Sequence, residues 1–324
     1  MTRSAPFVVL GIGVAIVSTA SILIRYAQAD GASSALIAAG RLSLAALLMA
    51  PLALSRAGPE LLRLRRKDLL LCATSGLLLG AHFWTWTASL EYTSVANSTV
   101  LVTTNPVWVA LLSAWLLKEK PRRVQLIGVS LTLAGTLLIF LAENAHGTPT
   151  SAPLLGNSLA LLGALAASGY LLIGRGLRSN LSLLSYVWLT YSFAALALIV
   201  AALASDESIS SVSGKAWLLI AALALGPQLL GHTSFNWALR RLSATFVALS
   251  ILGEPIGSAL LAWWLLDEGF VGLQLAGFAA LLGGILVAAR AENTDASEEH
   301  ANTPIAQDQE RKSSPQRHEA HKEN

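Results

Sequence analysis

The side chains that could carry chemistry in this sequence lie inside long apolar segments, and Glu254 is the strongest candidate. It stands near the middle of the apolar segment 244–266, directly before Pro255. Within a bilayer an ionised carboxylate costs several kcal/mol, so it must meet a cation, reach water or take up a proton. We expect Glu254 to couple to protons or to bind a substrate amine. The alternative is a structural ion pair or hydrogen bond between helices.

A second group of polar residues follows the segment 215–239. Gln228, His232 and Asn236 are four residues apart, so on an α-helix they would share one face. Pro227 precedes them and removes a backbone donor, which is tolerated at membrane depth only where protein or water compensates. We predict that this face is a wall of a substrate cavity. The alternative is hydrogen bonding between helices.

Three further segments contribute candidates. His82 and Trp86 share a face of the segment 68–90, and an aromatic wall there would suit flat or cationic organic compounds. Asn105 and Pro106 occupy the middle of the segment 94–117. We expect Pro106, Pro255 and Pro227 each to kink its helix. Arg41 lies well inside the segment 33–55, where a partner is needed; an ion pair with Glu254 is one option.

Several kinds of chemistry have no support in the sequence. It contains no phosphate-binding glycine loop, no HExxH motif and no nucleophile elbow. The histidines near the end, His300, His318 and His321, are too scattered for a metal site. We therefore expect no catalytic residue, no metal and no cofactor. The single cysteine, Cys72, cannot form an internal disulfide.

The elements that position these residues must be membrane-spanning helices. The chain of 324 residues is 54% hydrophobic and 13% charged, whereas soluble domains contain about 25% charged residues. Continuous apolar runs of about 20 residues indicate α-helical spans rather than alternating strands. The net charge of +3 gives no reason to expect nucleic acid as a partner. The sequence predicts an all-α polytopic protein with ten transmembrane helices, at about 6–27, 33–55, 68–90, 94–117, 123–142, 154–175, 183–204, 215–239, 244–266 and 270–290.

The two halves of the chain resemble each other. The stretch 94–138 recurs without a gap as 243–287, so that Pro106 matches Pro255 and Glu119 matches Glu268. Each copy holds five spans, and an odd number of spans places the second copy upside down in the membrane. Two inverted five-helix repeats are typical of transporters that bind substrate near the midplane. Glu119 and Glu268 would close their spans on opposite sides.

Basic residues predict the orientation of these repeats. They cluster in the loops after every second span, whereas the opposite loops hold mostly acidic or neutral residues. The positive-inside rule then places both termini in the cytoplasm. The basic residues are Arg56, Arg63, Arg65, Arg66, Lys67, Lys118, Lys120, Arg122, Arg123, Arg175, Arg178, Arg240 and Arg241.

Composition and the repeat also divide the chain. We expect a first five-helix repeat at 1–142, an external linker at 143–153 and a second repeat at 154–290. Residues 291–324 contain almost no large apolar side chains, so we expect a disordered cytoplasmic tail there.

The repeated pattern resembles the EamA-type branch of the drug/metabolite transporter superfamily. The resemblance rests on the prolines Pro106 and Pro255, on the closing segments Leu116-Leu117-Lys118-Glu119 and Leu265-Leu266-Asp267-Glu268, and on the glycine-bearing span after each. It covers residues 6–290. It implies a ten-helix secondary transporter with a central cavity lined largely by the third, fourth, eighth and ninth spans.

Together these observations predict a secondary-active transporter of a bacterial inner membrane that exports a small metabolite, amino acid or amphipathic organic compound by alternating access. Proton coupling through Glu254 is one option. The alternatives are an uncoupled facilitator or an importer, and, from another class, a membrane-embedded enzyme acting on lipids or acyl groups. No oligomeric state follows from these residues.

Overall fold

The chain forms a bundle of helices in the computed structural model, which describes residues 5–93, 95–116, 123–145, 151–204, 212–266 and 272–301. Every regular element in these ranges is a helix, as the continuous apolar segments predicted. The elements are α1 (Ala5–Val17), α2 (Ala20–Ala29), α3 (Ser34–Leu62), α4 (Arg66–Tyr92), α5 (Val95–Val102), α6 (Asn105–Leu116), α7 (Arg123–Ala145), α8 (Pro153–Leu177), α9 (Leu183–Leu203), α10 (Gly214–Leu223), η2 (Ala224–His232), α11 (Thr233–Ala238), α12 (Ala244–Ile251), α13 (Glu254–Leu266) and α14 (Gly272–Ala301).

Many of these helices are suited to a bilayer. Within the described ranges, seven helical stretches are long and apolar enough to cross a membrane, and two shorter apolar helices lie at Leu126–Ile139 and Gly272–Val287. The exposed surface of the bundle carries large apolar side chains such as Leu47, Leu218 and Trp264, which suits contact with lipid rather than water. A polytopic helical membrane protein is therefore confirmed, while the count of ten spans stays a prediction.

Two helices break at matching positions in the two halves. α5 ends at Val102 and α6 begins at Asn105, whereas α12 ends at Ile251 and α13 begins at Glu254. Each break lies just before a proline, Pro106 or Pro255, because proline has no N–H to donate and its ring clashes with the carbonyl four residues earlier. Asn105 and Glu254 therefore both stand in the first turn of a new helix.

The helix kink predicted at Pro227 takes an unexpected form. Around Pro227 the chain forms a π-helix, η2, between α10 and α11. A π-helix has a wider turn than an α-helix because its hydrogen bonds join residues five apart. His232 lines the central cavity described below, whereas the buried side chain of Gln228 is not part of its lining.

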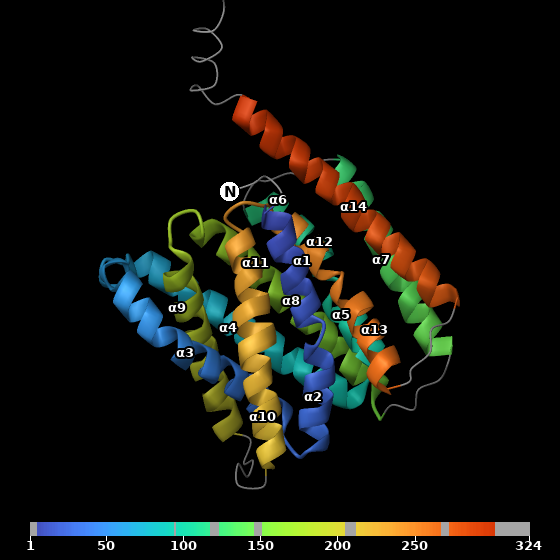
Figure 1. Ribbon diagram of the computed structural model, residues 1–324, viewed down its shortest axis with the longest axis horizontal. Coiled ribbons are helices and arrows are strands. Elements are labelled where there is room, and N and C mark those ends of the chain that lie inside the picture. The colour runs from blue at the N-terminus through green and yellow to red at the C-terminus, as the bar shows by residue number, and fades with distance from the viewer. Residues whose placement is uncertain are drawn as a thin grey trace, which may run out of the picture.

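Helices of the first half pack against helices of the second in a reciprocal pattern. Figure 1 shows α7 beside α14 at one edge, running in opposite directions, and α3 beside α9 at the other edge. α4 packs against α8, and correspondingly α1 and α2 pack against η2 and α10. If the two halves are exchanged, each of these contacts corresponds to another contact in the same bundle. The centre of the bundle lies where the two halves meet.

Glycines let α7 and α14 approach closely. A Cβ atom at Gly135 would lie 2.6 Å from the carbonyl oxygen of Gly277, and one at Gly277 would lie 2.8 Å from that of Gly135. Both distances are far below a van der Waals contact. The two helices thus meet backbone to backbone at the edge of the bundle, away from its centre.

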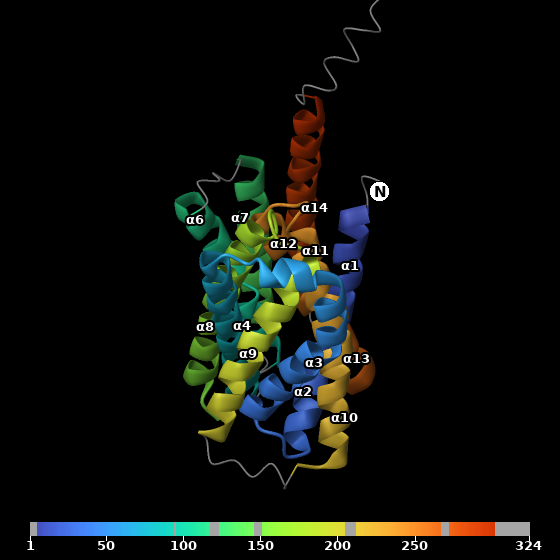
Figure 2. The ribbon, with the colours of Figure 1, turned by 90° about the vertical axis from the view of Figure 1, so that its left-hand side faces the viewer.

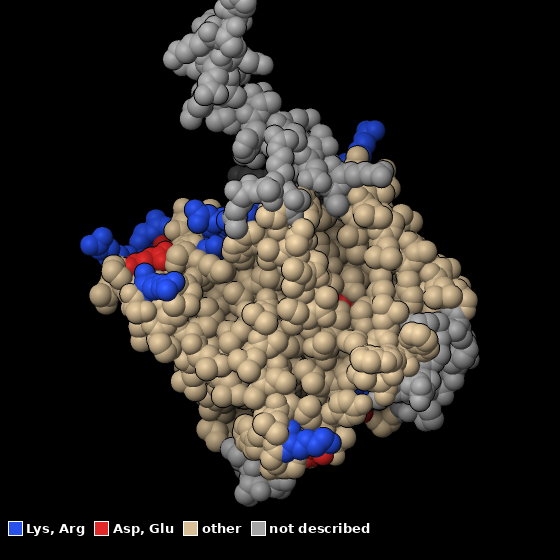
Figure 3. Space-filling model, in the orientation of Figure 1, with Lys and Arg blue, Asp and Glu red and all other residues tan. Residues whose placement is uncertain are grey.

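The last helix and the charged side chains mark the two ends of the bundle. α14 continues past residue 290 to Ala301, so the start of the segment expected to be a disordered tail is helical. Its sequence is rich in Ala and Glu, which favour extension of a helix already formed. The start of α1 and the end of α14 lie at the same end (Figures 1 and 2). Most Lys and Arg side chains on the face in Figure 3 gather there too.

Candidate functional site

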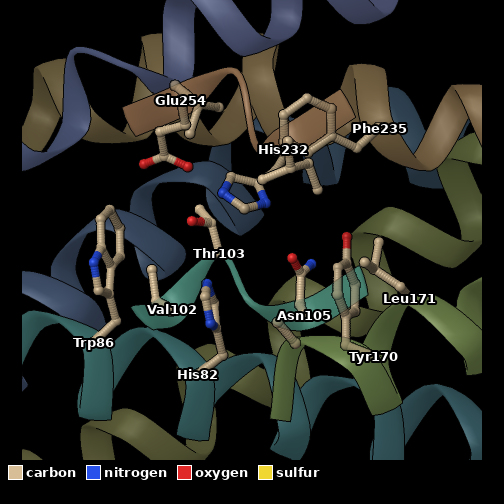
Figure 4. Close-up of a pocket in the computed structure, with 13 residues that line it drawn as sticks. His82, Trp86, Val102, Thr103, Asn105, Tyr170, Leu171, His232, Phe235 and Glu254 are labelled. Carbon is tan, nitrogen blue, oxygen red and sulfur yellow. The ribbon is translucent and has the colours of Figure 1, made fainter. Parts of the chain in front are cut away.

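A small cavity lies at the centre of the bundle, where the broken helices of both halves meet (Figure 4). Its volume is about 30 Å³, which is room for a water molecule or two and far below the 300–1,000 Å³ of a typical ligand pocket. The cavity is therefore almost closed in this conformation. Its walls are Val17, His82, Trp86, Val102, Thr103, Asn105, Ala167, Tyr170, Leu171, His232, Phe235, Ile251 and Glu254.

Matched positions of the two repeats line this cavity. In the register in which Pro106 matches Pro255, Asn105 matches Glu254, Val102 matches Ile251 and Trp86 matches Phe235. In the register in which Gly13 matches Gly163 and Ser18 matches Ser168, Val17 matches Ala167. The cavity thus lies on the boundary that relates the two halves, with chemically different residues in equivalent places.

Glu254 faces the cavity and is almost completely buried. Its side chain is 5% exposed, and its Oε1 atom has no hydrogen-bond partner in the described part of the chain. Two serines lie four residues to either side of it and make other bonds: Ser250 Oγ donates to the carbonyl of Phe246, and Ser258 Oγ donates to that of Ser18. The carboxylate is therefore held at the cavity with free hydrogen-bonding capacity.

Two histidines and a tryptophan form the facing wall. His82 Nδ1 lies 3.0 Å from the carbonyl oxygen of Gly163, and its ring stacks on Trp86 at 6.0 Å between centroids. The His232 ring lies 6.4 Å from that of His82, and its Nδ1 has no partner among the described residues. Figure 4 shows these side chains converging on the space in front of Glu254. The structure thus brings together His82, Trp86, His232 and Glu254.

Three other residues expected at the site lie behind the wall. Asn236 is fully buried; its Oδ1 accepts from the Tyr170 hydroxyl at 2.7 Å and its Nδ2 donates to the carbonyl of His232 at 2.9 Å. Gln228 is fully buried, and neither amide atom has a partner among the described residues. Arg41 is also fully buried, with its guanidinium carbon 4.0 Å above the Phe83 ring. Within the described chain it forms no ion pair with Glu254.

The structure adds lining residues that the sequence analysis did not single out. Tyr170 presents its ring to the cavity and is anchored by Asn236. Thr103 belongs to the break before Asn105, and its hydroxyl donates to the carbonyl of Thr99 at 2.7 Å. The internal repeat could have indicated Phe235 as the match of Trp86. No comparable signal marks Tyr170, because its partner lies on a distant span.

Polar contacts join the two halves at both ends of the bundle. At the basic end the Glu60 carboxylate of α3 accepts from the backbone N–H of Ser182 at 2.8 Å and from the hydroxyls of Ser182 and Ser185 at the start of α9. We call this contact the Glu60 clamp. At the opposite end Lys215 Nζ pairs with Asp30 at 2.8 Å.

Arg178 lies beside the Glu60 clamp and supports the α8–α9 connection. Its guanidinium donates to the backbone carbonyls of Asn236 and Leu181. Burial lowers the pKa of Arg178 to about 10, so it remains charged at neutral pH. The expected end-of-span carboxylates Glu119 and Glu268 lie outside the described residues. Among the described residues no three His, Cys, Asp or Glu side chains are grouped to hold a metal ion.

Comparison with known proteins gives the family. The model of the EamA-like transporter family matches twice, at residues 6–141 and 154–290. The chain belongs to this family and so to the drug/metabolite transporter superfamily. The double match also agrees with two copies of one unit in the sequence.

Individual relatives are more distant. "Uncharacterized transporter YetK" of Bacillus subtilis is 27% identical over 61% of this chain and 61% of its own length. "Uncharacterized transporter YyaM" of the same species is 24% identical over 54% of this chain and 58% of its own length. The chain thus spans about three fifths of these relatives. One crystal structure at 20% identity has a TM-score of 0.71 and covers 90% of this chain and 99% of its own, which shows the same fold.

Proposed function

We propose that this protein is a secondary transporter that exports a small metabolite, amino acid or amphipathic organic compound by alternating access. The observation that carries the proposal is the central cavity, which matched positions of both halves line and into which Glu254 projects. A site on the boundary between two similar units can open to either side as the units rock against each other.

The reciprocal packing supports an inverted arrangement of the repeats. α7 and α14 pair while running in opposite directions (Figure 1), and so each half faces the bilayer in the opposite sense. Corresponding polar contacts support it as well. Arg25 donates to the carbonyl of Leu90 in the first half, and Arg175 donates to that of Leu239 in the second. We propose ten spans with both termini on one side, as two inverted repeats of five spans would have.

The charge distribution supports an orientation. The start of α1 and the end of α14 lie at the basic end of the bundle (Figures 1 and 3). The positive-inside rule assigns this end to the cytoplasm. We propose a bacterial inner membrane as the location, with the Glu60 clamp on the cytoplasmic side and the Asp30–Lys215 pair on the outer side.

The cavity is small and the two halves touch at both ends of the bundle, so we assign this conformation to an occluded intermediate. The Glu60 clamp joins α3 to α9, and Lys215 of α10 joins the first half through Asp30. Rocking would break one contact while keeping the other. In this scheme Asn105, His232 and Tyr170 contact the substrate, His82 and Trp86 form the facing wall, and Glu254 exchanges a proton during the cycle.

Two experiments test this function in sequence. Growth medium is profiled for compounds that accumulate with cells that express the intact chain but not with cells that express Glu254→Ala. The compound found is then loaded into proteoliposomes containing the wild type, Glu254→Gln or the control Asp68→Asn, and its efflux is followed with and without a pH gradient. We expect Glu254→Gln to lose the response to the gradient. Normal efflux by Glu254→Gln with an undiminished response would refute the coupling role.

The alternatives predict other results. An uncoupled facilitator would equilibrate the compound in the wild type without any response to the gradient, and an importer would deplete it from the medium. A membrane enzyme would change the compound chemically, and product analysis would reveal the change. Membership of a transporter family favours transport over catalysis.

A further inference from the structure

Arg41 holds a positive charge deep in the bundle without hydrogen bonds. Its side chain is fully buried, and none of its three guanidinium nitrogens has a partner in the described part of the chain. Burying a charge without partners is costly, and stacking on the Phe83 ring returns only part of that cost. The described part of the protein therefore does not supply the hydrogen-bond acceptors that the Arg41 guanidinium needs.

The neighbours of Arg41 supply further unused polar atoms but no acceptor in contact. α3 packs against α4, α9 and η2. The charge of Arg41 interacts with four titratable groups: Tyr191 of α9, Glu254 of α13, His82 of α4 and His232 of η2. These groups stand in one neighbourhood around the guanidinium.

Gln228 belongs to the same neighbourhood. The Tyr191 hydroxyl donates to the Gln228 backbone carbonyl at 3.3 Å. The Gln228 side-chain amide is fully buried, and both its atoms lack partners among the described residues. η2, which carries this amide, packs against α3, which carries Arg41. A buried amide and a buried guanidinium on packed helices, both without partners among the described residues, suit an anion site.

One layer of rings separates Arg41 from the cavity. The guanidinium stacks on Phe83, and the Phe83 ring lies 5.0 Å from that of His232, which lines the cavity. Enlarging the cavity toward α3 by moving these rings would join it to Arg41. Glu254 stands on the cavity wall and makes no contact with Arg41 within the described chain, so the guanidinium keeps donors for a second anion that such a movement would admit.

We propose that Arg41 binds a carboxylate of the transported compound, with Gln228 as a further donor, and that the substrate is therefore an organic anion. The planar fork of arginine matches a carboxylate in a two-point contact, which lysine cannot reproduce. The apolar part of the substrate lies against Phe83, His82 and Trp86. This inference rests on the proposed transport function and assigns the substrate class to it.

The test uses the full chain purified in detergent and three probes of the same shape. The probes are 3-phenylpropionate, its neutral amide 3-phenylpropanamide and the cation 2-phenylethylamine. Thermal unfolding is followed by tryptophan fluorescence over a range of probe concentrations at constant ionic strength, with chloride titrated as a separate arm. We expect a dose-dependent rise of the unfolding temperature with the carboxylate and none with the amide or the amine.

Variants separate this role from a structural one. Arg41→Lys keeps the charge but loses the fork, and the half-saturating concentration of the carboxylate should rise on the order of 30-fold. Arg41→Met should abolish the response yet keep or raise the unfolding temperature without probe, because it removes a buried charge that has no partner. The matched control Arg25→Lys alters an arginine that already has a backbone partner, and it should leave the response unchanged.

Each other result overturns the inference. Equal stabilisation by the amide would show that shape rather than charge is recognised. Stabilisation by chloride alone would assign Arg41 to an inorganic anion. If the unfolding temperature drops in both Arg41 variants while Arg41→Lys keeps its response to the carboxylate, then Arg41 has a structural role and does not bind substrate. If the profiled cargo of the transporter proves to be neutral or cationic, the proposed function stands and only the organic-anion assignment fails.

Discussion

The Glu60 clamp offers a direct way to change which side of the transporter is open. Glu60 belongs to α3 of the first half, and all three groups that donate to it belong to the start of α9 in the second half. The contact therefore exists only while the two halves are together at the basic end. Weakening it should favour the conformation that is open at this end.

The size of the effect follows from the three hydrogen bonds. A bond to a charged acceptor contributes about 1.5–3 kcal/mol and one to a neutral acceptor about 0.5–1.5 kcal/mol. Glu60→Gln keeps an acceptor but removes the charge, which would cost about 1 kcal/mol for each bond. Glu60 is only partly buried, so solvent screening reduces the sum, and we take about 1.5–3 kcal/mol in total. That shift multiplies the population of the open state by about 10 to 100.

Thiol labelling measures this population. Cys72 is the only cysteine in the sequence, so Cys72→Ser provides a thiol-free background. Ala167→Cys then places a reporter thiol on the cavity wall. Its reaction with a charged, membrane-impermeant reagent is timed in inside-out and in right-side-out vesicles. Glu60→Gln should raise the labelling rate about 10-fold or more from the basic end and lower it from the other.

A carboxylate at the same end of the bundle serves as the control. Asp68 pairs with Arg65 at 2.8 Å within the first half and does not bridge the halves. Asp68→Asn should therefore leave both labelling rates unchanged. If Glu60→Gln and Glu60→Ala also leave them unchanged, the clamp does not hold this end closed and the gating argument is wrong.

Two further predictions concern the cavity wall and the packing at the edge. Tyr170→Phe removes the donor to Asn236 and should lower the free energy of unfolding by about 0.6–1.5 kcal/mol in an SDS titration; an unchanged midpoint would mean that the bond contributes nothing. Gly135→Ala should cost about 1–3 kcal/mol in the same titration, because its Cβ would meet the backbone of Gly277 at 2.6 Å. Gly283→Ala is the control, with its nearest atom at 3.5 Å, and equal costs for both alanines would contradict the close packing of α7 and α14.

The class of the protein and the location of its site were within reach of the sequence. Apolar runs of span length require helices in lipid, because every backbone polar group must be satisfied within the segment. The recurrence of Pro106 as Pro255 indicated two similar halves and two matching helix breaks. Asn105 and Glu254 occupy the first turns after these breaks because proline acts locally on the backbone, and such local effects can be predicted from neighbouring residues.

Only the tertiary structure decided which polar side chains face the cavity. Gln228 and His232 stand four residues apart in η2, yet of the two only His232 lines the cavity. Asn236 turned to hold Tyr170, a partner on another span. These outcomes depend on how distant helices pack, and spacing along one helix carries no information about that.

The packing of distant helices also decides which groups surround the buried charges. The sequence placed Arg41 and Glu254 inside the bilayer, where each needs compensation, and it allowed an ion pair between them. The packing of α3 against α4, α9 and η2 instead put Arg41 on Phe83 and left its nitrogens without partners among the described residues. The cost of a buried charge is set by its residue type and depth, whereas the group that balances it is chosen by contacts between segments far apart in the chain.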